Sequence, residues 1–490
     1  MFQYGRNFEE SIIMHKSTTA YFGGNDYNSL QGGDRKPLRR RTGISEAHLG
    51  GAARKQAIGN TRDLRRNFAV AAWGIRKHLD YVSDFKFKAK GDDEQLKLYL
   101  AQKVRQWSSK RNFDQSGRFS LSKGLRLMES SRFVDGDVFA YKLRNGKVQF
   151  IEADRVKNLS KENDKDYKNK SWVEGMLIDD KSQRIEKLRV GQRTGSGNLK
   201  FLADVNYSDI LPLAYVERFD QWRGISPLLS GMNIFQDQAE ASQYALAKLK
   251  IEQLFGIAFY RDGDESLGLA TNNGTNLDDI LDPADIAQNG YDVDLGKGPL
   301  QLDLDPGDRA EFLESSNPSN QAQDYMLMMI EMACKTLDFP VNFYDESKAN
   351  FAGSRGAMIN YRKSTLSKKA DIAEWLNDWF FWRVRADIAN GDTYLAENLE
   401  SIQFEWVPSG FEWWDTLKQA KGAREMISMG LDNPQRIAKE TDTDFYDNID
   451  EIASAKAYAQ SKGVDLNLGM LEEPTEETAD EEMPEQEDRK

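Results

Sequence analysis

Clustered carboxylates are the side chains of this 490-residue chain whose type and spacing could support chemistry. Paired carboxylates can hold two divalent metal ions on a phosphodiester, which is the arrangement of a metal-dependent nuclease. The cluster lies in a segment interrupted by glycine, asparagine and proline, without an accompanying histidine or lysine constellation. A solvated acidic surface is therefore the favoured interpretation, and a nuclease is the minor alternative. The cluster consists of Asp278, Asp279, Asp282, Asp285, Asp292 and Asp294.

Other residues that commonly carry catalysis are scarce. The three histidines, His15, His48 and His78, lack metalloprotease spacing, and the single cysteine cannot complete a His/Cys metal site. Cys334 lies in the apolar run Tyr325–Leu337, which is typical of a small buried hydrophobic side chain. The chain contains neither a phosphate-binding Walker loop nor a nucleophile elbow. We therefore predict no enzymatic activity, no metal and no cofactor.

The net charge of −13 divides unevenly along the chain. The segment Asp262–Asn320 carries fourteen acidic residues against Lys297 and Arg309, and the twenty residues from Leu471 carry ten acidic residues against two basic ones. The remainder is mildly basic.

One cysteine favours a reducing compartment, Met1–Leu30 lacks the apolar core of a signal peptide, and no run approaches the ~18 apolar residues of a membrane span. We expect a soluble protein made in a cytoplasm.

Basic and aromatic clusters mark two further segments. Residues 1–60 are expected to form a loosely ordered arm, whose basic cluster at 35–41 either touches a neighbour or nucleic acid or is solvated. Helical spacing makes the aromatic cluster within 375–382 a packing face rather than a platform for stacking bases. A second basic group could face a phosphate backbone, with a solvated face as the alternative. It consists of Lys348, Arg355, Arg362, Lys363, Lys368 and Lys369.

The periodicity of the apolar residues predicts an α+β fold that is mainly α. The turn Asn145-Gly146 between two alternating runs predicts a hairpin, inside a mixed β region over Val134–Val216. Apolar residues at helical spacing predict the other elements. Shorter helices are expected at Thr61–Asp80, Asp93–Ser108, Ser120–Ser131, Trp414–Met429, Pro434–Thr441 and Asp447–Lys462, and long helices at Ser226–Leu254, Ala322–Leu337 and Arg355–Ala389.

Several short motifs occur at Thr61–Asn67, Gly136–Phe139, Gln149–Val156, Val173–Gly175, Phe219–Leu229, Asp305–Gly307, Phe339–Val341, Asn350–Arg355 and Trp414–Leu431. Their residues and shared order resemble the lambda-type family of phage portal proteins. The chain departs from the family pattern at three places. Asp338 replaces a usual glycine, Ala352-Gly353 replaces paired serines, and Thr416 stands where a proline is common.

The resemblance implies a subunit with wing, stem, clip and crown regions that assembles into a twelve-subunit ring. It implies a basic arm at 1–60, a wing at 61–225, a first stem helix at 226–261, an acidic clip at 262–320, a second stem helix at 321–340, a tunnel loop at 341–354, a long tunnel helix at 355–412, crown helices at 413–463 and a disordered acidic tail at 464–490.

The function implied by the resemblance is that of a channel at one capsid vertex. Double-stranded DNA would be packaged through it by the large terminase and later ejected, and a head–tail adaptor, the major capsid protein and the scaffold protein would bind the ring. The subunit would lie in the virion after assembly in the host cytoplasm, without a membrane partner. A virion scaffold or adaptor that does not enclose DNA is the alternative.

The resemblance also implies roles for individual residues. The six clustered aspartates would dock partners at the clip, and Arg362 and Lys363 would face phosphate. The tunnel loop would present Lys348, Asn350, Phe351, Ser354 and Arg355 to the DNA.

Overall fold

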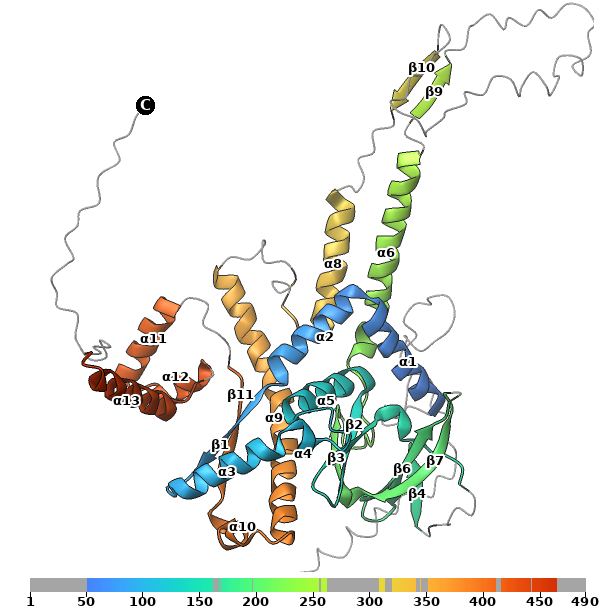
Figure 1. Ribbon diagram of the computed structural model, residues 1–490. Helices are drawn as coiled ribbons and strands as arrows, with labels where there is room; N and C mark the ends of the chain where they lie inside the picture. The colour runs from blue at the N-terminus through green and yellow to red at the C-terminus, as the bar shows by residue number, and fades with distance from the viewer. Residues whose placement is uncertain are drawn as a thin grey trace, which may run out of the picture.

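Two long helices, α6 (Leu228–Leu254) and α8 (Asn320–Thr336), project side by side from a body of helices and antiparallel sheets (Figure 1). The computed structural model describes residues 51–161, 167, 169–195, 197–254, 257–261, 308–312, 320–340, 344, 351–410, 416–441 and 443–464. The fold is α+β and mainly α, as predicted. None of the helices in these ranges is long and apolar enough to cross a membrane.

The first helices form two segments where a single helix was expected. Helix α1 (Gly51–Asn67) and helix α2 (Ala69–Val82) are separated by Phe68, whose backbone is extended. The break lets α1 pack on the base of α6, while α2 packs against α5 and α9. The first half of α1 is thus ordered, although it was assigned to the arm; residues 1–50 lie outside the described residues. Three helices follow in the chain: α3 (Glu94–Trp107), α4 (Lys110–Phe113) and α5 (Leu121–Asp135).

The three-stranded and four-stranded sheets of the body are both antiparallel. The predicted hairpin is present, and Gly146 adopts a φ of 79° in its turn. Every ladder between named strands is antiparallel, so the expectation of a mixed region was wrong. The first sheet has the order β3-β2-β8 and the second the order β4-β5-β6-β7. Their strands are β2 (Asp137–Lys142), β3 (Val148–Glu152), β4 (Lys170–Val173), β5 (Met176–Asp179), β6 (Ile185–Arg193), β7 (Leu199–Asn206) and β8 (Ile210–Ala214), with short 3-10 helices η2 (Ala153–Arg155) and η3 (Tyr207–Asp209).

One two-stranded sheet, which the sequence did not predict, pairs an early segment of the chain with a late one. Strand β1 (Phe85–Lys90) pairs with β11 (Gln403–Pro408), which is far away in the sequence.

Strands β9 (Ile257–Arg261) and β10 (Asp308–Phe312) pair beyond the far end of α6. The acidic residues 262–307 between these two strands lie outside the described residues.

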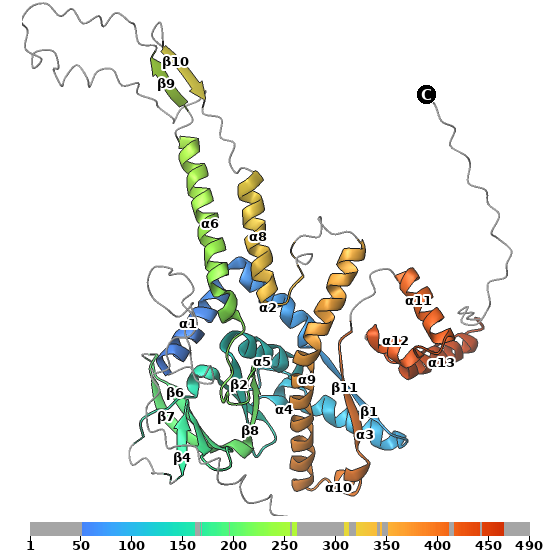
Figure 2. The ribbon, with the colours of Figure 1, turned by 180° about the vertical axis from the view of Figure 1, so that it is seen from behind.

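Helix α9 (Phe351–Ala389) runs through the main hydrophobic core. Trp375, Trp379 and Phe380 are buried there against Trp107 and Trp406, so the aromatic cluster is a packing face, as predicted. Short elements α10 (Thr393–Glu397) and η7 (Leu399–Ser401) lead to β11. The last helices are α11 (Thr416–Ser428), α12 (Pro434–Glu440) and α13 (Phe445–Ser461), on the flank of the body opposite α1 (Figures 1 and 2).

Candidate functional site: the projecting helices and the start of α9

The projecting helices approach each other closely at their base. A Cβ atom on Gly231 of α6 would lie 2.3 Å from Oγ1 of Thr336 of α8, so only glycine fits at this position. Along their length the two helices expose large apolar side chains; Tyr244, for example, is 73% exposed. Apolar side chains gathered on an exposed surface mark a site where another molecule binds. The exposed set is Tyr244, Leu246, Tyr325, Met328 and Met332.

The start of α9 contains the residues predicted to face DNA. Helix α9 begins at Phe351, four residues before the predicted start at Arg355. Ser354 is therefore a buried helical residue, whereas Arg355 and Lys363 are exposed. Arg362 forms an ion pair of 3.1 Å with Glu440 of α12. Lys348 and Asn350 lie outside the described residues, as does the side chain of Phe351.

Two lysines of the basic group, for which a phosphate contact or a solvated face was expected, instead hold α9 in the body. Lys368 and Lys369 are both buried. The Nζ of Lys368 lies 3.1 Å from Asp338, and the Nζ of Lys369 donates a hydrogen bond of 2.8 Å to the carbonyl of Ser409. The prediction failed because the sequence does not show which face of a long helix is covered.

Asp338 explains one departure from the family pattern. Its φ is 60°, in the left-handed region that favours glycine, immediately after the end of α8. A glycine would be unstrained here, but it could not form the ion pair with Lys368. In this chain, Asp338 links the end of α8 to the middle of α9.

A buried polar network joins α2, α5 and α9. Nε2 of His78 lies 2.6 Å from Glu129, which also accepts a hydrogen bond of 2.8 Å from Arg132. Arg132 in turn contacts Asp371 of α9 at 2.7 Å. Burial lowers the pKa of His78, although its hydrogen bond to Glu129 opposes this shift. Burial would raise the pKa of Glu129, but Arg132 and His78 hold it below the ordinary value. His78 is therefore a neutral donor to an ionised Glu129.

The motif residues around Asp137 meet at a second buried cluster. The carboxylate of Asp137 accepts hydrogen bonds from Arg223 at 2.7 Å and from Arg54 at 2.8 Å, and a further one from the backbone N–H of Gly224. Gly136 and Gly224 lie back to back, since a Cβ on Gly224 would lie 1.9 Å from the carbonyl oxygen of Gly136. Two motifs that are far apart in the sequence therefore fix the junction between the sheets and the base of α6.

The structure describes the single cysteine but not the acidic cluster. Asp278, Asp279, Asp282, Asp285, Asp292 and Asp294 lie outside the described residues. Within the described ranges, no group of three or more histidine, cysteine or carboxylate side chains could hold a metal ion. Cys334 is buried, and burial raises the pKa of its thiol to about 11, as expected of a small core side chain.

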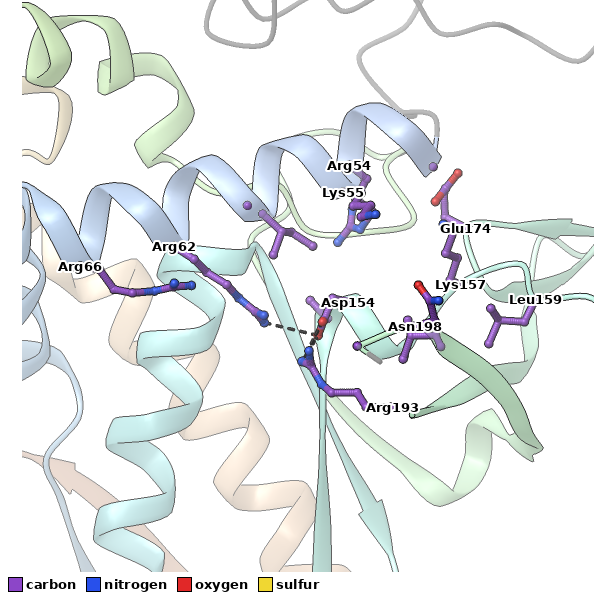
Figure 3. Close-up of a pocket in the computed structure, with 17 residues that line it drawn as sticks. Arg54, Lys55, Arg62, Arg66, Asp154, Lys157, Leu159, Glu174, Arg193 and Asn198 are labelled. Carbon is purple, nitrogen blue, oxygen red and sulfur yellow. Dashed lines mark hydrogen bonds and ion pairs between the residues drawn. The ribbon is translucent and has the colours of Figure 1, made fainter. Parts of the chain in front are cut away.

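A basic pocket is the feature that the sequence prediction missed. It has a volume of about 510 Å³ and lies between α1 and the segment around η2 and the β6–β7 turn (Figure 3). Arg54, Ile58, Arg62 and Arg66 line it from α1. Their spacing of four residues places them on one face of the helix, which is the signal that the sequence offered. The residues opposite α1 come from distant segments and could not be paired with it in advance.

Comparisons with known proteins place the chain in a family. The model of the phage portal protein, lambda family, matches residues 39–368. A chain in the neck of an empty gene transfer agent particle is 12% identical, with 78% of this chain and 94% of that chain covered and a TM-score of 0.47. A portal protein of the HK97 family from Corynebacterium diphtheriae is also 12% identical, with 66% and 88% covered and a TM-score of 0.29. No curated protein matches significantly. Because the family model spans most of the sequence, this chain belongs to the lambda family of phage portal proteins.

Proposed function

We propose that copies of this chain form a closed ring at one capsid vertex, through which double-stranded DNA is packaged and later ejected. The observation that carries the proposal is the set of exposed apolar side chains on the projecting helices α6 and α8, of which Tyr325, Met328 and Met332 have the spacing of one helix face. A head-to-tail ring covers two different faces of each subunit, and so would bury side chains that a lone subunit leaves exposed. Membership of the portal family supports the same conclusion.

The regions of the ring are assigned in the proposal by position in the fold. The body up to β8 forms the wing, α6 and α8 form the stem, and the strand pair β9–β10 leads into the clip. The start of α9 lies next to the tunnel loop, and α11–α13 form the crown. Twelve subunits are proposed, with the terminase and a head–tail adaptor binding at the clip, and capsid and scaffold proteins binding around the ring.

The proposed channel must let DNA pass without holding it. Each Lys or Arg that contacts a phosphate releases counterions and adds affinity, which would slow translocation. At the start of α9, Arg355 and Lys363 are exposed, but Arg362 is paired and Lys368 and Lys369 are buried. Few positive charges therefore remain for DNA on the described part of this helix. The proposed role is structural and requires no catalytic group.

Negative-stain electron microscopy with mass photometry of the purified full chain tests the proposal. We expect symmetric rings of about a dozen subunits around an open channel. A stable monomer or dimer at micromolar concentration, even when capsid protein is added, would favour the adaptor instead. DNA cleavage that needs Mg²⁺ and disappears on replacing Asp278 and Asp279 would favour the nuclease.

A further inference from the structure

The basic pocket beside α1 has a charge imbalance that the proposed channel does not use. Six basic and two acidic residues line it (Figure 3). Arg62 is paired with Asp135 at 2.6 Å and Arg193 with Asp154 at 2.7 Å, and both arginines also contact Glu152 just outside the pocket, so the excess of positive charge comes from the remaining lysines and arginines. The six basic residues are Arg54, Lys55, Arg62, Arg66, Lys157 and Arg193, and the acidic ones are Asp154 and Glu174.

Several of these positive charges lack a partner. Within the described ranges, neither Lys55, Arg66 nor Lys157 has a carboxylate in ion-pair distance. Lys55 and Arg66 are exposed at the pocket, and Lys157 lines the opposite wall beside Glu174 (Figure 3). A concave site with this excess of positive charge attracts a chain that carries several negative charges.

The floor of the pocket adds to the imbalance. Arg54 and Arg223 are both buried and share the one carboxylate of Asp137. Nε of Arg54 is buried without a hydrogen-bond partner among the described residues. Burial and the neighbouring Arg223 lower the pKa of Arg54 to about 10. An anion in the pocket would add a counter-charge for Arg54, which otherwise shares the carboxylate of Asp137 with Arg223.

We propose that the pocket binds the acidic residues 471–490 of a neighbouring copy of this chain. That segment carries ten acidic residues against two basic ones, so its charge is opposite to that of the pocket. A DNA duplex is a convex rod, and only its outermost phosphates would reach the rim. The other acidic segment is a weaker candidate because β9, which leads into it, lies at the far end of α6 (Figure 1).

The positions of the two ends of the body favour a neighbouring copy. Helix α13 and helix α1, which lines the pocket, lie on opposite flanks of the body (Figures 1 and 2). In the ring of the proposed function, on which this inference rests, opposite flanks of adjacent subunits face each other. Twenty-six residues follow Val464, and at about 3.3 Å per residue they span up to roughly 85 Å. The acidic segment would thereby tie adjacent subunits together.

Binding is tested with a ring that lacks residues 471–490 and a fluorescent peptide of those residues. We expect saturable binding at low salt that weakens strongly at 0.5 M NaCl, because the contacts are between charges. Lys55→Glu together with Lys157→Glu should weaken binding by about ten-fold or more. Lys181→Glu, an exposed lysine on the β5–β6 turn, is the matched control and should leave binding unchanged.

Absence of binding, or equal binding to the pocket variant, would overturn the proposal. Displacement of the peptide by a 20-base-pair DNA duplex that binds at the pocket would also overturn the proposal, because DNA would then be the occupant. Mass photometry of the same samples tests the proposed function separately. An absence of rings would contradict ring formation, whereas the peptide measurement tests binding at the pocket.

Carbodiimide cross-linking of mixed rings identifies which subunit supplies the segment. The first type of subunit carries Lys55→Glu and Lys157→Glu and keeps residues 471–490. The second type has a different tag, an unchanged pocket and no residues 471–490. The two types are mixed before cross-linking. Cross-links between the two tagged chains are expected. Cross-links within single wild-type chains only would show that the segment folds back on its own subunit.

Discussion

Asp137 connects two buried guanidinium groups from separate segments of the chain. Replacing it with asparagine leaves Arg54 and Arg223 buried without a counter-charge, which should reduce the free energy of unfolding by about 3–5 kcal/mol. Chemical denaturation monitored by circular dichroism measures the loss. Asp80→Asn, which removes an exposed ion pair with Arg126, is the control and should cost about 1 kcal/mol or less. Equal effects of the two changes would contradict this account.

Asp338 combines a strained backbone with an ion pair to Lys368. Asp338→Ala keeps the strain and loses the pair, whereas Asp338→Gly loses both. The glycine variant should therefore be more stable than the alanine variant by about 1 kcal/mol. Thermal unfolding at a fixed protein concentration compares the two variants. An alanine variant as stable as the glycine variant would show that the positive φ carries no cost.

His78 should make stability depend on pH. Burial depresses its pKa in the folded state, so the unfolded state takes up a proton near the ordinary value of about 6.5 while the folded state does not. Its contribution to stability is present above that pH and is lost as the pH falls below it. The melting temperature should drop between pH 7.5 and pH 5.5 by less in His78→Gln than in the wild type. Identical drops would rule out His78 as the responsible group.

Packing between elements, rather than helix propensity, should decide the effect of glycine substitutions. Propensity alone predicts that Gly231→Ala stabilises α6 by about 1 kcal/mol. The new Cβ would clash with Thr336, so we expect the variant to melt at a lower temperature because α6 and α8 are forced apart. Gly422→Ala in α11, where no atom lies within 4 Å of the added Cβ, should be neutral or stabilising. Calorimetry of both variants separates the two effects.

Long periodic elements could be predicted from the sequence, whereas their contacts could not. The hairpin at Asn145-Gly146 and the helices α6, α8 and α9 follow from local turn chemistry and apolar spacing. Strand β1 was missed because it is short and its partner β11 is remote in the sequence. The break at Phe68 was missed because the apolar pattern continues through it.

The candidate site was predicted in type but not in detail. The basic residues on α9 were found from composition, but the burial of Lys368 and Lys369 depends on Asp338 and Ser409, which belong to other segments. The pocket beside α1 requires Lys157 and Arg193 to lie opposite the helix. Such long-range arrangements are set by the tertiary fold and leave no local pattern.

At the scale of the whole molecule, the exposed apolar side chains of α6 and α8 should control assembly. Tyr325→Glu together with Met332→Glu places two charges in the proposed subunit contact, where they would be desolvated without partners. We expect mass photometry to find mainly monomers for this variant. Leu98→Glu, an exposed position on α3, is the control and should still form rings. Rings formed by the double variant would show that Tyr325 and Met332 lie outside the contact between subunits.

The pairing of β1 with β11 has a consequence for synthesis on the ribosome. The core cluster that contains the two strands also takes side chains from α3, α5 and α9, and it ends at Trp406. A nascent chain therefore cannot complete this core until Pro408 has left the exit tunnel, when most of the polypeptide has already been made. Such non-local closure slows folding and leaves apolar surface open for longer. The protein should thus depend on chaperones during translation more strongly than its helical content suggests.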